Sequence, residues 1–164
     1  ALSLPYERVV GLLGEAAEHV CNNAASLGSV RLLKWARENN RAWSVSTCTL
    51  AALNGHLPAL KYLHENGCPW DRSTCTYTAA NGHLPALKYL HENGCPWDVR
   101  TCVFAVRRGH LPALQYLHEN GCPWDDLTCY SAAQRKHWDC LQYAVDNKCP
   151  GWEGFAKTYW EHLQ

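Results

Sequence analysis

The sequence predicts an all-α protein, a solenoid of stacked helical hairpins. The first observation is an internal repeat. The segment GHLPALKYLHENGCPWD occupies residues 55–71, recurs at 82–98 and returns at 109–125 with Lys88 replaced by Gln115. The copies begin 27 residues apart, and each period contains the start and stop signals of two short helices. A pair of such short helices cannot bury its apolar side alone, but stacked pairs can, which favours a solenoid.

The first helix of a unit is expected over residues 72–81. Asp71 precedes it and is a good N-cap, because its carboxylate can accept a backbone N–H of the first turn. No proline or glycine interrupts the segment, and Gly82 follows it. Glycine adopts the left-handed conformation that a helix end requires, so Gly82 should terminate the helix.

The second helix of the unit is expected to end at Gly94. Pro85 fits its first turn, where the missing N–H costs nothing. Leu84, Leu87 and Leu90 recur at a spacing of three and predict a buried stripe. A Cys-Pro-Trp-Asp turn then leads into the next unit, and we expect its tryptophan to pack across the junction between neighbouring units.

We expect one repeat domain over residues 1–164, with atypical ends that act as caps. Arg37 and Val145 replace the periodic histidine in the terminal units, and a final segment contains Trp152, Phe155 and Trp160. The predicted divisions are an N-terminal cap and degenerate repeat at 1–42, repeats at 43–69, 70–96, 97–123 and 124–150, and a C-terminal cap at 151–164.

The stretch AANGHLPALKYLHENG resembles the ankyrin repeat. The residues that match the family pattern are Ala79, Ala80, Gly82, His83, Leu84, Leu87, Leu90, Asn93 and Gly94. The usual repeat has 33 residues, so the β-hairpin finger of the family should be shortened or absent here. The Cys-Pro-Trp-Asp junction is similar to that of short arrays found in large DNA viruses and protists. The resemblance implies a protein-binding scaffold with no chemistry of its own.

The first helices differ from unit to unit, whereas the second helices are nearly identical. The varying positions lie four residues apart, on one side of each helix, and predict a recognition surface. Drift at unconstrained exposed positions is the alternative interpretation. The expected partner-binding residues are Val45, Leu53, Arg72, Thr76, Val99, Val103, Arg107, Arg108, Tyr130, Gln134 and Arg135. Among them we expect Arg107, Arg108, Arg135 and Tyr130 to be anchors, because arginine and tyrosine are enriched at binding hot spots.

Cysteine and histidine also follow the 27-residue period, and they allow three interpretations. Free cysteine commonly packs as a small apolar residue, and then no cofactor is expected. Alternatively, one imidazole and two thiolates would suit zinc at each junction and make a metal-stabilised array, although a structural site needs a fourth ligand. The third interpretation is disulfide bonds between cysteines at different positions of the repeat, such as Cys68 with Cys75. The zinc candidates are His64, Cys68, Cys75, His91, Cys95, Cys102, His118, Cys122 and Cys129.

Composition argues against several other classes of protein. Fifteen basic residues balance fifteen acidic ones, so no strong field attracts nucleic acid or a membrane. No apolar run reaches the ~18 residues of a membrane span. Three near-identical Cys/His sets argue against catalysis, since an active site does not need to be triplicated. We expect a monomeric, non-catalytic, intracellular protein (cytoplasmic or nuclear) that binds another protein.

Overall fold

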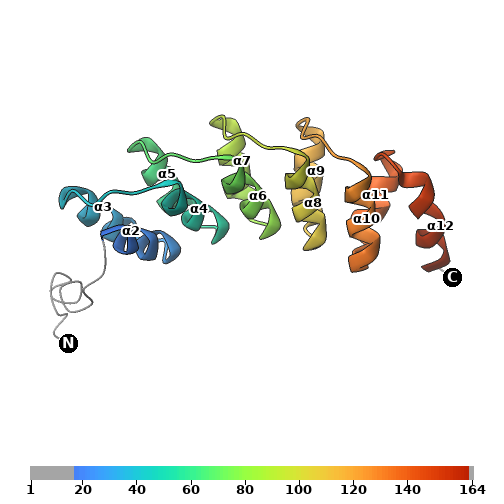
Figure 1. Cartoon of the computed structure of the whole chain (residues 1–164), viewed down its shortest axis with the longest axis horizontal. Coiled ribbons are helices and arrows are strands. Elements are labelled where there is room, and N and C mark those ends of the chain that lie inside the picture. Colours follow the sequence, from blue (N-terminus) through green and yellow to red (C-terminus); the bar gives the residue numbers. More distant parts are fainter. Residues whose placement is uncertain (1–16, 163–164) are drawn as a thin grey trace.

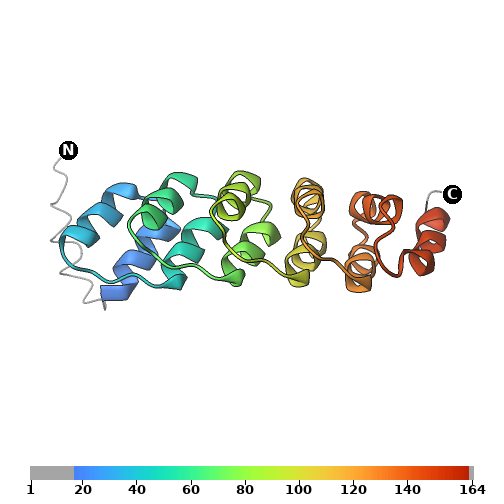
Figure 2. The ribbon, with the colours of Figure 1, turned by 90° about the horizontal axis from the view of Figure 1, so that it is seen from above.

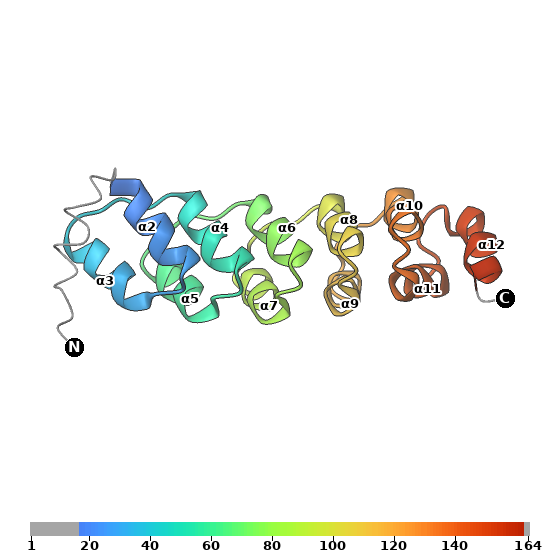
Figure 3. The same ribbon diagram turned by 90° about the horizontal axis from the view of Figure 1, so that it is seen from below.

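The computed structural model describes residues 17–162, in which ten of the eleven helices form two layers (Figure 1, Figure 3). The first-helix layer contains α2 (Ala17–Ser26), α4 (Val45–Leu53), α6 (Arg72–Ala80), α8 (Val99–Arg107) and α10 (Asp126–Arg135). The second-helix layer contains α3 (Val30–Glu38), α5 (Leu57–Glu65), α7 (Leu84–Glu92), α9 (Leu111–Glu119) and α11 (Trp138–Asp146). Helix α12 (Trp152–His162) follows them at the C-terminal end (Figure 2). The predicted all-α solenoid is confirmed.

The first helices begin where the sequence places an N-cap. Asp71 accepts the backbone N–H groups of Ser73 and Thr74 at 2.9 and 3.4 Å, and the Thr74 hydroxyl accepts the Asp71 N–H at 3.4 Å. These bonds pair backbone donors that the first turn of a helix leaves free. At the other end Gly82 has φ +71°, the left-handed conformation expected of it.

The second helices supply the largest core side chains. Pro85 lies in the first turn of α7, and Leu87 and Leu90 are completely buried. Equivalent leucines of α3, α5, α9 and α11 continue this row, and half-buried Trp70 and Trp97 pack against it at the turns. Because every hairpin shares its apolar side with its neighbours, the core runs along the whole stack rather than closing within one unit.

A histidine and a glycine connect each repeat to the preceding one. The His56 Nε2–H donates to the Ser26 carbonyl at 2.9 Å, and the ring packs on Gly28. The same contact recurs between His110 and Gly82, where a Cβ added to the glycine would lie 2.5 Å from the ring. Glycine is therefore required there both for its positive φ and for the space that the histidine occupies.

Threonine hydroxyls connect successive first helices. Thr49 of α4 bonds with Thr74 of α6 at 2.8 Å, and Thr76 of α6 bonds with Thr101 of α8 at 3.3 Å. The series then stops, and the buried hydroxyl of Thr128 in α10 has no hydrogen-bond partner among residues 17–162. The repeat explains why: Val103 stands where the two preceding units have a threonine.

The ends of the chain differ from the central repeats. Residues 17–42, predicted as degenerate, form a complete hairpin of α2 and α3. At the other end Trp152 and Phe155 of α12 pack against the core, whereas the side chain of Trp160 and residues 1–16 lie outside the described part. Within residues 17–162 no helix is long and apolar enough to cross a membrane.

Candidate functional site

The exposed side of the first helices is a narrow stripe. Helices α4, α6 and α8 each pack against their own second helix and against a first helix on either side, so three of their flanks are covered. Tyr77 of α6 is 46% exposed, whereas Thr76 beside it is 7% exposed and bonds with Thr101. Thr76 therefore offers a partner almost no surface, contrary to the sequence-based expectation. Phe104 of α8 follows Tyr77 in this stripe, with their ring centroids 6.5 Å apart.

Most of the other expected partner-binding residues reach the surface. Tyr130 is 48% exposed and accepts a hydrogen bond from Gln134, and Arg72 forms an exposed ion pair with Asp98. The partly buried ones are Val45, Leu53, Val99 and Val103, and the exposed ones are Arg72, Arg107, Arg108, Tyr130, Gln134 and Arg135. Sequence reasoning missed Leu50, Tyr77 and Phe104. The signal was available, because these equivalent positions also vary from unit to unit.

Three arginines line a hollow of about 400 Å³ at the C-terminal ends of α6, α8 and α10. They are Arg107, Arg108 and Arg135, and the rings of Tyr77 and Phe104 lie in the same lining. The Arg107 guanidinium lies 5.6 Å from the centre of the Phe104 ring. Within the described chain these three guanidinium groups form no ion pair or hydrogen bond, and no acidic residue lines the hollow.

A second, largely apolar groove of about 470 Å³ lies beside it, between α4 and α6. Val45, Leu50 and Leu53 line one side, and Asp71 and Tyr77 line the other. Tyr77 thus borders both hollows. The first-helix layer thus presents an apolar groove between α4 and α6 and a group of three arginines at the C-terminal ends of α8 and α10.

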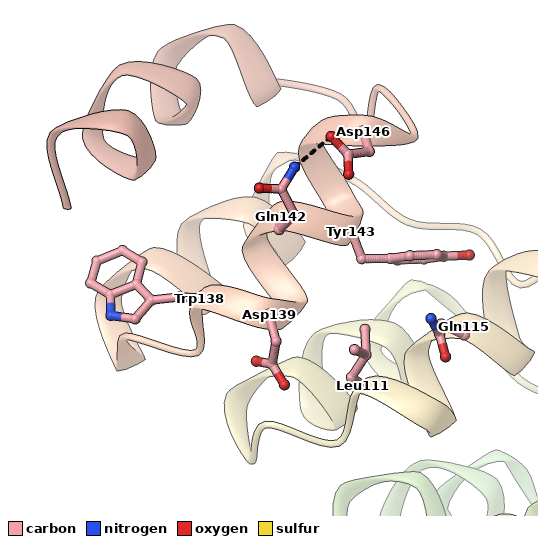
Figure 4. A pocket seen from close by; sticks show the side chains of 7 residues that line it. All are labelled: Leu111, Gln115, Trp138, Asp139, Gln142, Tyr143 and Asp146. Atoms are coloured by element: carbon pink, nitrogen blue, oxygen red, sulfur yellow. Dashed lines mark hydrogen bonds between the residues drawn. The ribbon is translucent and has the colours of Figure 1, made fainter. Parts of the chain in front are cut away.

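A third hollow, of about 400 Å³, lies in the other layer between α9 and α11 (Figure 4). Asp139, Tyr143 and Asp146 line it, and Asp146 accepts a hydrogen bond from Gln142 at 2.6 Å. In the preceding repeat the Lys88 ammonium covers the equivalent tyrosine ring at 5.4 Å. Gln115, the single change among the three repeated segments, has no ammonium group to place over the Tyr143 ring. The hollow is shallow, and its acidic side chains are partly occupied by bonds within α11.

The cysteines pair within repeats, not across the junction that sequence reasoning proposed. The Cys75 thiol approaches the Cys95 carbonyl at 3.8 Å, and the Cys95 thiol donates to the Asp71 carbonyl at 3.3 Å. The same arrangement joins Cys48 with Cys68. Each cysteine pair connects the turn that follows the second helix of a hairpin to the first helix of the same hairpin. All ten cysteines are buried and free, and the neighbour of Cys75 is Cys95 rather than Cys68, so the alternative interpretation of a Cys68–Cys75 disulfide has no support here.

The candidate zinc residues also have other contacts. The His64 ring stacks on Trp70 with centroids 3.8 Å apart, and its Nδ1 hydrogen-bonds with the Tyr89 hydroxyl at 3.0 Å. Similar stacked rings hold His91 and His118. Among the described residues no three His, Cys, Asp or Glu side chains form a group that could hold a metal ion. The predicted convergence of each histidine with two cysteines is therefore not found.

Several buried thiols are poorly suited to nucleophilic chemistry, whereas hydrogen bonds with Cys48 and Cys149 lower the pKa of Cys68 and Cys129. A hydrogen bond to the Cys95 thiol and burial raise the pKa of Cys75 far above its usual value. Burial raises the pKa of Cys140 to about 12. Since the thiolate is the reactive form, these groups stay protonated and inert at neutral pH.

Comparisons with known proteins agree with this architecture. A family model described as ankyrin repeats (many copies) matches residues 48–91 and 75–118. Of the solved structures, 157 chains match. One is the ankyrin repeat domain of human ASB11, with a TM-score of 0.65 and 22% identity, over 79% of this chain and 69% of that one. A search of curated proteins found no match. Ankyrin repeats generally serve as protein-interaction scaffolds, and the repeats at residues 48–118 of this chain belong to the ankyrin repeat family.

Proposed function

We propose that this protein is a non-catalytic scaffold that binds a partner protein through the exposed stripe of α4, α6, α8 and α10. The observation that supports this most directly is where large apolar side chains remain exposed. In the described chain they are Leu27, Tyr77, Leu127 and Tyr130, and three of these four lie on this stripe. Clustered exposed apolar residues mark interaction sites, and aromatic residues dominate binding hot spots.

Variation between the repeats supports the same stripe. Positions 50, 77, 104 and 131 hold Leu, Tyr, Phe and Ser, whereas the second helices α5, α7 and α9 differ at one residue. Drift would also change exposed positions of a first helix. It would not place tyrosine and phenylalanine in edge-to-face contact beside uncompensated arginines.

The test compares two sets of variants in binding to one verified partner. The partner would be isolated by affinity capture with the wild-type chain and then purified, and its Kd measured by calorimetry. Tyr77→Ala with Tyr130→Ala should weaken binding at least tenfold, since hot-spot residues contribute ~2 kcal/mol or more. Lys61→Ala with Lys88→Ala, on the second-helix layer, should leave Kd unchanged. Equal affinities for all three proteins would show that the stripe is not the binding face.

A further inference from the structure

The exposed stripe has a local positive charge, although the charge of the whole chain is balanced. Basic and acidic residues balance over the sequence, yet Arg107, Arg108 and Arg135 meet in one hollow without an acidic neighbour. Like charges gathered at one place repel each other, and a cleft of one sign attracts ligands of the other. The hollow therefore has an uncompensated positive charge.

Helix capping does not account for Arg108. Positive side chains are favourable near the negative end of a helix dipole. However, α4 and α6 end with asparagines, whose amides donate to the last turn: Asn54 to the Leu50 carbonyl and Asn81 to the Tyr77 carbonyl, both at 2.8 Å. Arg108 occupies the equivalent position in α8 and forms no such side-chain bond. The replacement gives up a capping bond and adds a free guanidinium.

The hollow has the composition of a carboxylate-binding site. Guanidinium groups bind carboxylates through two parallel hydrogen bonds, and arginine loses little hydration on binding. The Phe104 ring beneath Arg107 limits the positions that this side chain adopts. A volume of about 400 Å³ falls within the range of ligand pockets and exceeds the size of one acidic side chain.

The neighbouring apolar groove adds a second requirement. Val45, Leu50 and Leu53 of this groove would bury an apolar side chain. The groove lies between α4 and α6, and the arginines lie on α8 and α10, roughly one and a half helix spacings away. Helices pack ~8–10 Å apart, and an extended chain covers ~3.3 Å per residue, so about four residues separate the two sites.

Resting on the proposed function, we infer that the partner presents an extended acidic segment to this face. One or more Asp or Glu carboxylates enter the hollow of Arg107, Arg108 and Arg135, and an apolar side chain about four residues away occupies the groove beside Leu50 and Leu53. The charge of the hollow determines the chemistry of the segment, and Tyr77, which borders both sites, determines its path.

The probe for this inference is a phage-displayed library of random 16-residue peptides, selected on the full chain. Bound peptides should be enriched in Asp and Glu, with Leu, Ile or an aromatic residue three to five positions away. Synthetic copies should lose at least tenfold in affinity on Arg107→Glu with Arg108→Glu. Replacing Asp and Glu of these peptides by Asn and Gln should reduce their affinity by a similar factor. Lys61→Glu with Lys88→Glu makes the same change of charge on the other layer and should leave binding unchanged.

Other outcomes would overturn the inference. Peptides without acidic enrichment that still lose affinity on Tyr77→Ala would contradict the acidic partner and leave the proposed function standing. Peptides insensitive to every variant of the stripe would contradict both. An empty selection would contradict the linear acidic segment, while the purified-partner experiment would still decide the function. Tighter binding of a random single-stranded oligonucleotide than of any peptide would identify nucleic acid as the anionic partner instead.

Discussion

Helices α5, α7 and α9 have nearly the same sequence, whereas α4, α6 and α8 share chiefly a Thr-Cys pair and small residues. The second helices repeat the same contacts from unit to unit. Leucines face the core, histidines stack on tryptophans, and even exposed Lys61 lies 5.4 Å from the Tyr89 ring centre. The exposed stripe of the first helices has fewer contacts inside the chain, such as the Tyr77–Phe104 ring contact and the Arg72–Asp98 ion pair. The repeats differ in sequence where side chains have few contacts inside the chain. At those positions a binding function can determine which residues are kept.

The largest expected effect compares the same substitution in the two layers. Leu87→Ala in α7 removes a completely buried side chain and should cost ~2–5 kcal/mol of unfolding free energy. Leu127→Ala in α10 changes a side chain that is 53% exposed and should stay within ~0.5 kcal/mol of the wild type. Urea unfolding measures both. Equal costs would show that the stripe contributes to stability as the core does.

A second comparison separates backbone conformation from repeat packing. Gly82 and Gly94 both have positive φ, but only Gly82 faces a histidine ring, whereas a Cβ on Gly94 would meet nothing within 4 Å. Gly94→Ala should cost ~1–2 kcal/mol from the left-handed conformation alone. Gly82→Ala should cost clearly more, since the His110 ring must move. If thermal unfolding gave equal losses, the histidine contact would not hold the repeats together.

Restoring the threonine series should stabilise the stack. The buried Thr128 hydroxyl has no partner because Val103 interrupts the series. Val103→Thr would provide one, and the added bond should raise the unfolding free energy by about 1 kcal/mol. Val99→Thr, on the same helix but outside the series, is the control. A loss of stability in the Val103 variant would mean that the valine methyl groups contribute more than the missing bond.

The smallest expected effect is a pH dependence at the repeat junctions. Burial lowers the pKa of His110, and the charges of His83, Arg108 and His137 lower it further. An unfolded histidine titrates near pH ~6.5 and binds protons more readily than the folded one. Stability should therefore be complete above pH ~6.5 and decrease as the pH falls toward the folded pKa. Urea unfolding midpoints at pH 7.5 and pH 5 measure this decrease. The midpoint of the His110→Gln variant should fall less between these two pH values than that of the wild type.

The repeats, both helices of each unit and their capping residues were predictable from the sequence. Asp71 and Gly82 act through bonds within a few residues, so their local pattern determines their structure. The candidate face was only partly predictable. Spacing by four residues grouped Arg107, which is exposed, with Thr76, which is buried. The pattern shows that residues share one side of a helix, not which side a neighbouring helix covers.

The fold class follows from the amino-acid pattern alone, because a repeated pattern of caps, glycines and leucines allows only stacked hairpins to bury the apolar residues. Which cysteines meet depends instead on how the helices pack. Cys75 lies closer in sequence to Cys68, yet its neighbour is Cys95, because each hairpin closes on itself. The meeting of Arg107 with Arg135 was decided in the same way, since it depends on how closely α8 and α10 approach. Such contacts join residues about 20 to 28 positions apart, and packing between helices, not local pattern, determines them.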